Sequence, residues 1–149
     1  MTGTRKTLGF IGLVCAMALL IGCGYYRHVD PLILTYPDKL VAELSARAHA
    51  KEPGCKLWYN YGTTHSMEPL IVKGDWVVSK VTGWGEHLKG KVVTYAYDGK
   101  TEAMHRLVSG NSKDGFIASG DNNSSSEARN RVTADNFTGE VVAIYRFAP

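Results

Sequence analysis

Residues Lys91–Ser109 read KVVTYAYDGKTEAMHRLVS and have the pattern of a β-hairpin. The first part of this stretch is rich in valine and tyrosine, which favour strands. Asp98-Gly99 in the middle is a strong hairpin signal, because this pair tolerates the positive φ that tight hairpin turns require. The stretch therefore predicts two antiparallel strands, Lys91–Tyr97 and Glu102–Ser109, joined by a short turn.

Similar short runs lie on both sides of this hairpin. They are LWYNY at 57–61, WVVSKV at 76–81, Phe116–Ser119 and Glu140–Phe147. Several short strands separated by glycine-containing turns predict an all-β domain over residues 56–149.

A different pattern precedes the strands, in residues 27–55. Asp38 is placed to cap a helix in which Leu40, Val41, Leu44 and Ala48 share one face. Pro53-Gly54 ends it. The helix either lies on a membrane or packs on the domain as a linker, and we favour the second. Residues 25–37 are expected to be a tether with few regular features.

Residues 1–26 are expected to attach the protein to a membrane. Arg5 and Lys6 precede an uncharged run from Thr7 to Tyr26. The run is close to the roughly 20 apolar residues that span a bilayer, and it also suits a signal peptide. In both cases the basic residues stay in the cytoplasm. The rest of the chain is then expected on the extracytoplasmic (periplasmic) side of the cytoplasmic membrane.

Cys23 ends a short motif, Leu20-Ile21-Gly22-Cys23, that resembles the lipobox of bacterial lipoprotein precursors. That resemblance implies cleavage before Cys23 and attachment of lipid to it. A plain transmembrane helix that happens to end in cysteine explains the same residues equally well. Both interpretations remain open, and both make membrane lipid a partner.

The composition argues against several classes of protein. The 149 residues carry a formal net charge of +3, and the basic residues are spread along the chain, which argues against a nucleic-acid binder. The 3 cysteines are too few for a disulfide framework. Cysteine and histidine do not have the spacing of zinc sites, so no metal and no other cofactor is expected. His28, His49 and His87 belong to no motif.

Ser66 stands out because of the order of motifs around it. Alone, a serine in a loop is usually a turn residue. Here, however, short motifs follow one another from Tyr61 to about Val142 in the order and spacing typical of type I signal peptidases, which the chain resembles. The matching motifs are Ser66-Met67-Glu68-Pro69, Gly74-Asp75, Gly90-Lys91-Val92-Val93, His105-Arg106-Leu107-Val108 and Gly120-Asp121-Asn122-Asn123.

The resemblance implies Ser66 as the nucleophile and His105 as its general base. A serine hydroxyl needs a base within hydrogen-bond reach. Most bacterial members have lysine where this chain has His105, so the chain resembles the Ser/His branch found in the endoplasmic reticulum and in archaea. Strand alternation places Ala103, His105 and Leu107 on one face, as suits a partly buried base and equally a structural histidine.

A histidine base works better with an acid that fixes its tautomer. Asp121 is the first candidate and Glu127 the second. The motif around Glu127, Ser125 to Arg129, resembles a family box whose acid is aspartate, so the replacement leaves the acid's identity open. We favour Asp121, although it is equally suited to a turn.

The remaining site residues surround the nucleophile. The Ser66 N–H is one expected donor to an oxyanion. The resemblance implies the Thr64 hydroxyl as a second donor, and Met67 and Pro69 as the floor of a substrate cleft. His65 stands where the family usually has a small residue, and it is a weaker candidate base.

These features predict a membrane-anchored serine endopeptidase with a signal-peptidase-like all-β catalytic domain. Its substrate would be a precursor protein or peptide with small residues before the cut. One alternative is a specialised peptidase of the same fold with a single exported substrate. The other is a catalytically inactive, lipid-anchored β-domain that acts as a binding module. The sequence does not determine the oligomeric state.

Overall fold

A computed structural model describes residues 26–99, 101–124 and 130–148. The described chain is mainly β, as expected, with one α-helix and a short 3-10 helix at Glu86–Leu88. Its helix and strands, in chain order, are β1 Leu32–Tyr36, α1 Lys39–His49, β2 Cys55–Tyr59, β3 Trp76–Lys80, β4 Val92–Ala96, β5 Glu102–Asn111, β6 Gly115–Ser119, β7 Arg131–Val132 and β8 Phe137–Phe147.

The predicted hairpin is confirmed as β4 and β5. The two strands are antiparallel, with Tyr95 opposite Ala103 and Val93 opposite His105. Gly99 in the turn has φ 79°, the left-handed conformation that glycine adopts without strain. β5 continues beyond the hairpin to pair with β6, starting at Arg106.

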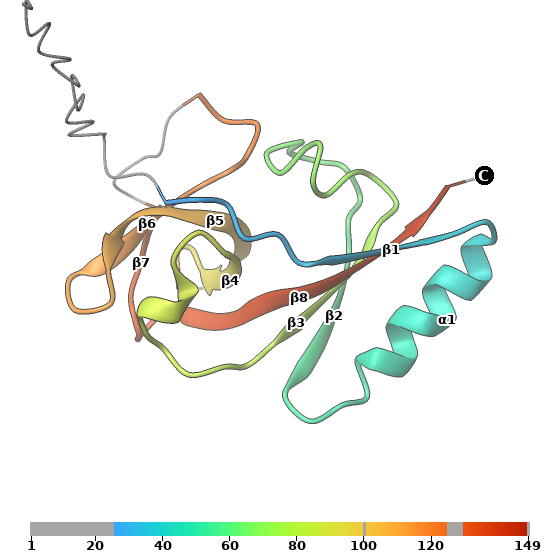
Figure 1. Cartoon of the computed structure of the whole chain (residues 1–149), viewed down its shortest axis with the longest axis horizontal. Coiled ribbons are helices and arrows are strands. Elements are labelled where there is room, and N and C mark those ends of the chain that lie inside the picture. The colour runs from blue at the N-terminus through green and yellow to red at the C-terminus, as the bar shows by residue number, and fades with distance from the viewer. Residues whose placement is uncertain (1–25, 100, 125–129, 149) are drawn as a thin grey trace, which may run out of the picture.

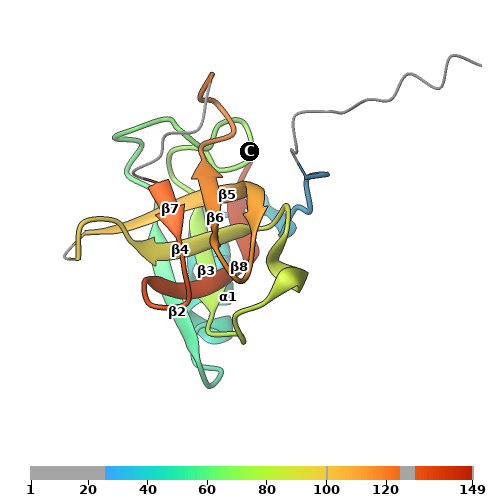
Figure 2. The same cartoon turned by 90° about the vertical axis from the view of Figure 1, so that its left-hand side faces the viewer.

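All strands belong to one sheet, in the order β2-β3-β8-β4-β5-β6-β7. The long β8 organises it, pairing with β3 along one edge and with β4 and then β1 along the other. Register shifts interrupt β3, β4 and β5, and such bulges increase the twist of a sheet. The sheet consequently curls into a half-barrel (Figures 1 and 2).

The expectation of an irregular tether before the helix was wrong. Residues Leu32–Tyr36 form β1, which runs parallel to the end of β8. Their sequence, LILTY, is rich in residues that favour strands, and β8 offers them a free edge. β1 therefore ties the start of the described chain to the sheet (Figure 1).

The helix was predicted correctly but its buried face was not. Asp38 caps α1 by accepting a hydrogen bond from the Val41 N–H at 2.9 Å. The residues that face the sheet are Ala42 and Ala46, whereas Leu40 and Leu44 are 62% and 56% exposed. Small side chains let the helix lie close to the sheet, so the larger apolar residues point outward.

Both faces of the sheet are buried near its centre. One core group contains Met67, Ile71 and Val77, and another contains Tyr95, Leu107 and Phe116. Over the described ranges, none of the helices is long and apolar enough to cross a membrane, and the expected anchor at 1–26 lies almost entirely outside them.

Candidate active site

Ser66 lies in the loop that joins β2 to β3. Residues that follow β6 hold this loop in place. The Asn122 N–H donates to the Ser66 carbonyl at 2.8 Å, and the Asn122 side chain donates to the His65 carbonyl at 3.2 Å. Gly120 lies so close that a Cβ there would be 2.3 Å from the Ser66 carbonyl oxygen. The Gly120-Asp121-Asn122 motif thus positions the serine loop by close backbone contact.

The structure brings Ser66 and His105 together across 39 residues of sequence. His105 Nε2 lies 3.2 Å from Ser66 Oγ. Both side chains are partly buried. A serine hydroxyl at this distance from an imidazole nitrogen can transfer its proton as it attacks a carbonyl carbon.

The other nitrogen of His105 contacts a tyrosine and not an acid. His105 Nδ1 lies 2.9 Å from the Tyr95 hydroxyl. Burial raises the pKa of Tyr95 to about 12, and Tyr97 adds to the rise, so the phenol stays neutral at physiological pH. If His105 Nδ1 carries the proton and donates it to the Tyr95 oxygen, Nε2 is left free to accept the proton of Ser66.

Asp121 was predicted to orient His105, and the structure contradicts that contact. Both carboxylate oxygens of Asp121 bind Arg106, at 2.7 Å from Nε and 2.7 Å from Nη2. Arg106 is 1% exposed, so its charge needs this partner. It also binds Asp30 and two backbone carbonyls, which places the ion pair at the join between β5 and the start of the chain.

Asp121 still acts on His105, through its charge. Burial lowers the pKa of His105 below 6.5, because the protonated imidazole loses its hydration. The Asp121 carboxylate offsets part of this decrease. The net result is a histidine that stays neutral, and able to accept a proton, at a lower pH than a solvent-exposed one.

Two hydrogen-bond donors lie close to the Ser66 hydroxyl. The Thr64 hydroxyl lies 3.3 Å from Ser66 Oγ. No described residue accepts a hydrogen bond from the Ser66 N–H. These are the two donors that the sequence predicted for an oxyanion hole, and that role stays a prediction.

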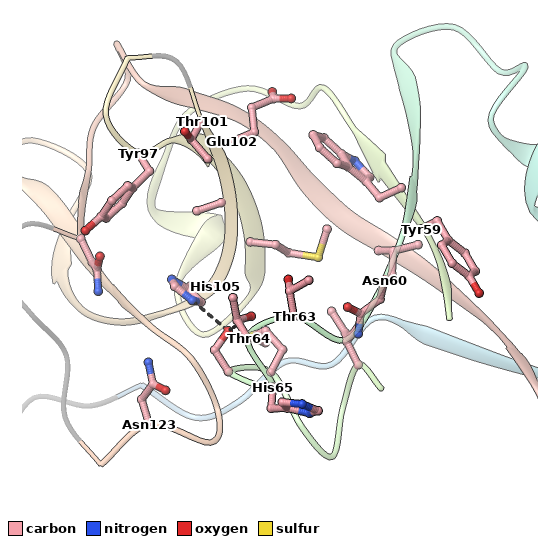
Figure 3. A pocket seen from close by; sticks show the side chains of 18 residues that line it. Tyr59, Asn60, Thr63, Thr64, His65, Tyr97, Thr101, Glu102, His105 and Asn123 are labelled. Carbon is pink, nitrogen blue, oxygen red and sulfur yellow. Dashed lines mark hydrogen bonds between the residues drawn. The ribbon is translucent and has the colours of Figure 1, made fainter. Parts of the chain in front are cut away.

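A pocket of about 580 Å³ opens beside the pair. Its apolar wall contains Met67, Ile71, Val77 and Met104, and its polar rim contains Asn60, Thr63 and Thr64 (Figure 3). Met67 was predicted to contact substrate and does line the pocket, although it is also part of the core. Pro69 is exposed and is not among the described residues that line the pocket, so its contact with substrate stays a prediction.

The other residues that the sequence singled out do not join Ser66 and His105. His65 points away from His105 in Figure 3, and its Nδ1 lies 2.7 Å from the Glu68 carboxylate. Its φ of 53° is the left-handed conformation, which favours glycine. Glu127 and Cys23 lie outside the described residues.

Sequence reasoning missed Tyr95 and Arg106. A signal for Tyr95 was present, because the Asp98-Gly99 turn sets the hairpin register. With Tyr95 opposite Ala103, His105 is its diagonal neighbour on the same face of the sheet, within reach of a long side chain. Arg106 follows the candidate base directly, but sequence offered no sign that its charge would be buried.

Comparisons of this chain with protein-family models, with curated proteins and with solved structures found no match.

Proposed function

We propose that the protein is a serine endopeptidase in which Ser66 is the nucleophile and His105 the general base. The observation that carries the proposal is the 3.2 Å contact between Ser66 Oγ and His105 Nε2 at the edge of an apolar pocket. The order of short motifs that resemble type I signal peptidases supports it, and no cofactor is required for this chemistry.

The proposed reaction has two steps. Ser66 Oγ attacks the carbonyl carbon of the peptide bond and passes its proton to His105 Nε2. Thr64 and the Ser66 N–H donate to the oxyanion that forms. His105 then gives the proton to the departing amine, which breaks the carbon–nitrogen bond and leaves an acyl-enzyme. Water, deprotonated by His105, then attacks the ester carbonyl carbon. His105 returns this proton to Ser66 Oγ as the acyl–oxygen bond breaks, which restores Ser66 and releases the carboxylic acid.

We propose that the substrate binds as an extended strand along β5. Pairing between β5 and β6 begins at Arg106, so among the described residues the stretch Glu102–His105 has a neighbouring strand, β4, on one side only. Ala103, Met104 and His105 of this stretch line the pocket. A peptide added to this edge would receive backbone hydrogen bonds and place alternate side chains in the pocket. The resemblance implies small side chains before the cut.

The membrane attachment is also proposed from sequence. Arg5 and Lys6 before an uncharged run place the catalytic domain on the extracytoplasmic side of the cytoplasmic membrane. The intact mass of the protein purified from membranes separates the two forms of anchor. A lipidated protein begins at Cys23 with added lipid mass, and Cys23→Ala stays uncut. A transmembrane form keeps its N-terminus in both proteins.

One observation favours the alternative of an inactive binding module. His105 Nδ1 contacts a neutral tyrosine, which stabilises an imidazolium less than a carboxylate does. A domain that binds a peptide strand without cleaving it would need the pocket and the β5 edge but not a basic His105. The two functions therefore differ in whether a bound peptide is cut.

A cleavage assay separates them. Membranes containing the wild-type protein, or Ser66→Ala, are incubated with a precursor that has alanines at the first and third positions before the cut. We expect cleavage by the wild type and none by Ser66→Ala, because the variant lacks only a partly exposed hydroxyl and keeps its fold. Ser45→Ala, on α1 and away from the pocket, should cleave normally. Equal cleavage by wild type and Ser66→Ala would rule out the assignment.

A further inference from the structure

A cluster of metal-ligating side chains lies where α1 ends and β2 begins. His49 is the last residue of α1, Glu52 lies in the turn, and Cys55 is the first residue of β2. One ligand atom from each residue lies within 4.8 Å of the other two. None of the three lines the pocket beside Ser66. The cluster is therefore separate from the candidate active site.

The ring of His49 is held in place from the sheet. Its Nδ1 lies 2.7 Å from the hydroxyl of Tyr145, a residue of β8. The two rings also meet edge to face, with centroids 6.0 Å apart. A hydrogen-bond partner that fixes a histidine ring is the usual companion of a metal-binding histidine, because it sets which way the ring points.

Glu52 is an exposed residue of the turn between α1 and β2. Glu52 is paired with Lys80 at 3.5 Å, a contact between exposed side chains that costs little to break.

We propose that His49, Glu52 and Cys55 bind Zn²⁺, with water completing the coordination. Nitrogen, oxygen and sulfur are the ligands that zinc takes in proteins, and zinc tolerates all three in one site. Mg²⁺ and Ca²⁺ prefer oxygen ligands and should bind poorly. The cation would hold the C-terminal end of α1 against the start of β2. Cys55 loses its thiol proton on binding.

The spacing of the ligands explains why sequence analysis missed the site. Pairs of cysteine or histidine at short spacing are the usual signal, and here each ligand type occurs once. The three come together because Pro53-Gly54 turns the chain back from the helix to the sheet. Gly54 takes φ 79° in that turn, which a residue with a side chain adopts only with strain.

Protection of Cys55 from a thiol reagent tests the proposal. The full-length protein is treated with iodoacetamide in EDTA, in Zn²⁺ alone or in Mg²⁺ alone, and alkylation is measured at Cys55 by peptide mass spectrometry. This readout excludes Cys15 and Cys23. With free Zn²⁺ about tenfold above its dissociation constant, alkylation should slow about tenfold, since about one site in ten stays empty. Mg²⁺ should have no effect.

Two variants show whether the cluster itself binds the ion. His49→Gln and Glu52→Gln should each lose the protection at this Zn²⁺ concentration, whereas His87→Gln, an exposed histidine outside the cluster, should keep it. The thermal midpoint gives a second measure that does not depend on these variants. Zn²⁺ should raise it in the wild type and leave Cys55→Ser unchanged. Absence of protection in the wild type, or equal protection in His49→Gln, would overturn the proposal.

Discussion

Tyr95 occupies the place beside His105 that a carboxylate holds in a Ser-His-Asp triad. A phenol with a pKa near 12 can accept a hydrogen bond from Nδ1–H and orient the ring, but it carries no charge to stabilise the imidazolium. Two consequences follow at the scale of single residues. One concerns the hydrogen bond itself and the other the pH range of activity.

Removing the Tyr95 hydroxyl should lower turnover while leaving substrate binding unchanged. Tyr95→Phe leaves Nδ1 of His105 without its partner, at a cost of about 1–3 kcal/mol, or roughly 5- to 150-fold in kcat. KM should change little, because the hydroxyl contacts the base and not the substrate. Tyr97→Phe is the matched control, since Tyr97 also lines the pocket but makes no hydrogen bond to His105. Equal kinetics in wild type and Tyr95→Phe would show that the tyrosine does not position the base.

The lowered pKa of His105 should set the acid side of the activity profile. The neutral imidazole is the active form, so activity is present above the pKa and is lost as the pH falls through it. Because burial holds this pKa below 6.5, kcat/KM should reach half its maximum at a pH below 6.5. The profile of kcat/KM against pH measures this midpoint for the free enzyme. A midpoint at or above 6.5 would mean that His105 is more exposed or is paired with an acid.

At the scale of elements, the segment after β6 supports the serine loop. Gly120 touches the Ser66 backbone, and the next residue, Asp121, pairs with the buried Arg106 of β5. This short segment therefore links the loop that carries Ser66 to the strand that carries His105. Its two residues act differently, one through steric fit and the other through charge.

Gly120→Ala should reduce activity by displacing the nucleophile. The added Cβ would lie 2.3 Å from the Ser66 carbonyl oxygen and 2.8 Å from its Cβ, so the serine loop must move. A displacement of about 1 Å at a reacting group can cost on the order of 100-fold in rate. Gly83→Ala is the control, because its Cβ would meet nothing within 4 Å. The kcat/KM of both variants is compared with wild type, and an unaffected Gly120→Ala would contradict this role.

Asp121→Asn should mainly destabilise the fold. The change leaves Arg106 buried with part of its ion pairing lost, and removing one partner of a buried pair typically costs about 3–5 kcal/mol. The free energy of unfolding in urea measures the loss. Glu43→Gln, which breaks the exposed pair between Glu43 and Arg47 on α1, should change it by less than about 1 kcal/mol. If Asp121→Asn lost turnover at unchanged stability, Asp121 would be an orienting acid after all.

Across the whole molecule, local signals in the sequence predicted where the hairpin turns and where the helix begins. They did not predict which distant parts of the chain pack against these elements. The Asp98-Gly99 turn and the Asp38 cap each depend on a few neighbouring residues, and both were predicted correctly. The strand β1 was missed because it forms by pairing with β8, which lies more than 100 positions further along the chain. Likewise, α1 buries Ala42 and Ala46 because of the sheet beneath it, which helical periodicity alone does not reveal.

In the candidate site, too, the residues were predicted but their contacts were not. Ser66, His105 and Thr64 were predicted from short motifs, and the fold brings all three together. The partners of His105 and Asp121 were not predicted, because each depends on contacts between strands. Asp121 lies near His105 and acts on it through its charge, but the guanidinium of Arg106 binds its carboxylate more directly. Arg106, which neighbours His105 on β5, competes with it for the Asp121 carboxylate, and the short motifs gave no sign of this competition.

We expect His105 to activate Ser66, and covalent labelling of the serine checks this activation. The full-length protein is treated with a fluorophosphonate, which reacts with activated serines, and the labelled residue is identified by peptide mass spectrometry. Activation by His105 predicts labelling at Ser66 in the wild type, strong loss in His105→Ala, and normal labelling in His65→Ala, whose imidazole faces Glu68. Labelling of Ser66 at the same rate with and without His105, or no labelling of Ser66 in the wild type, would contradict it.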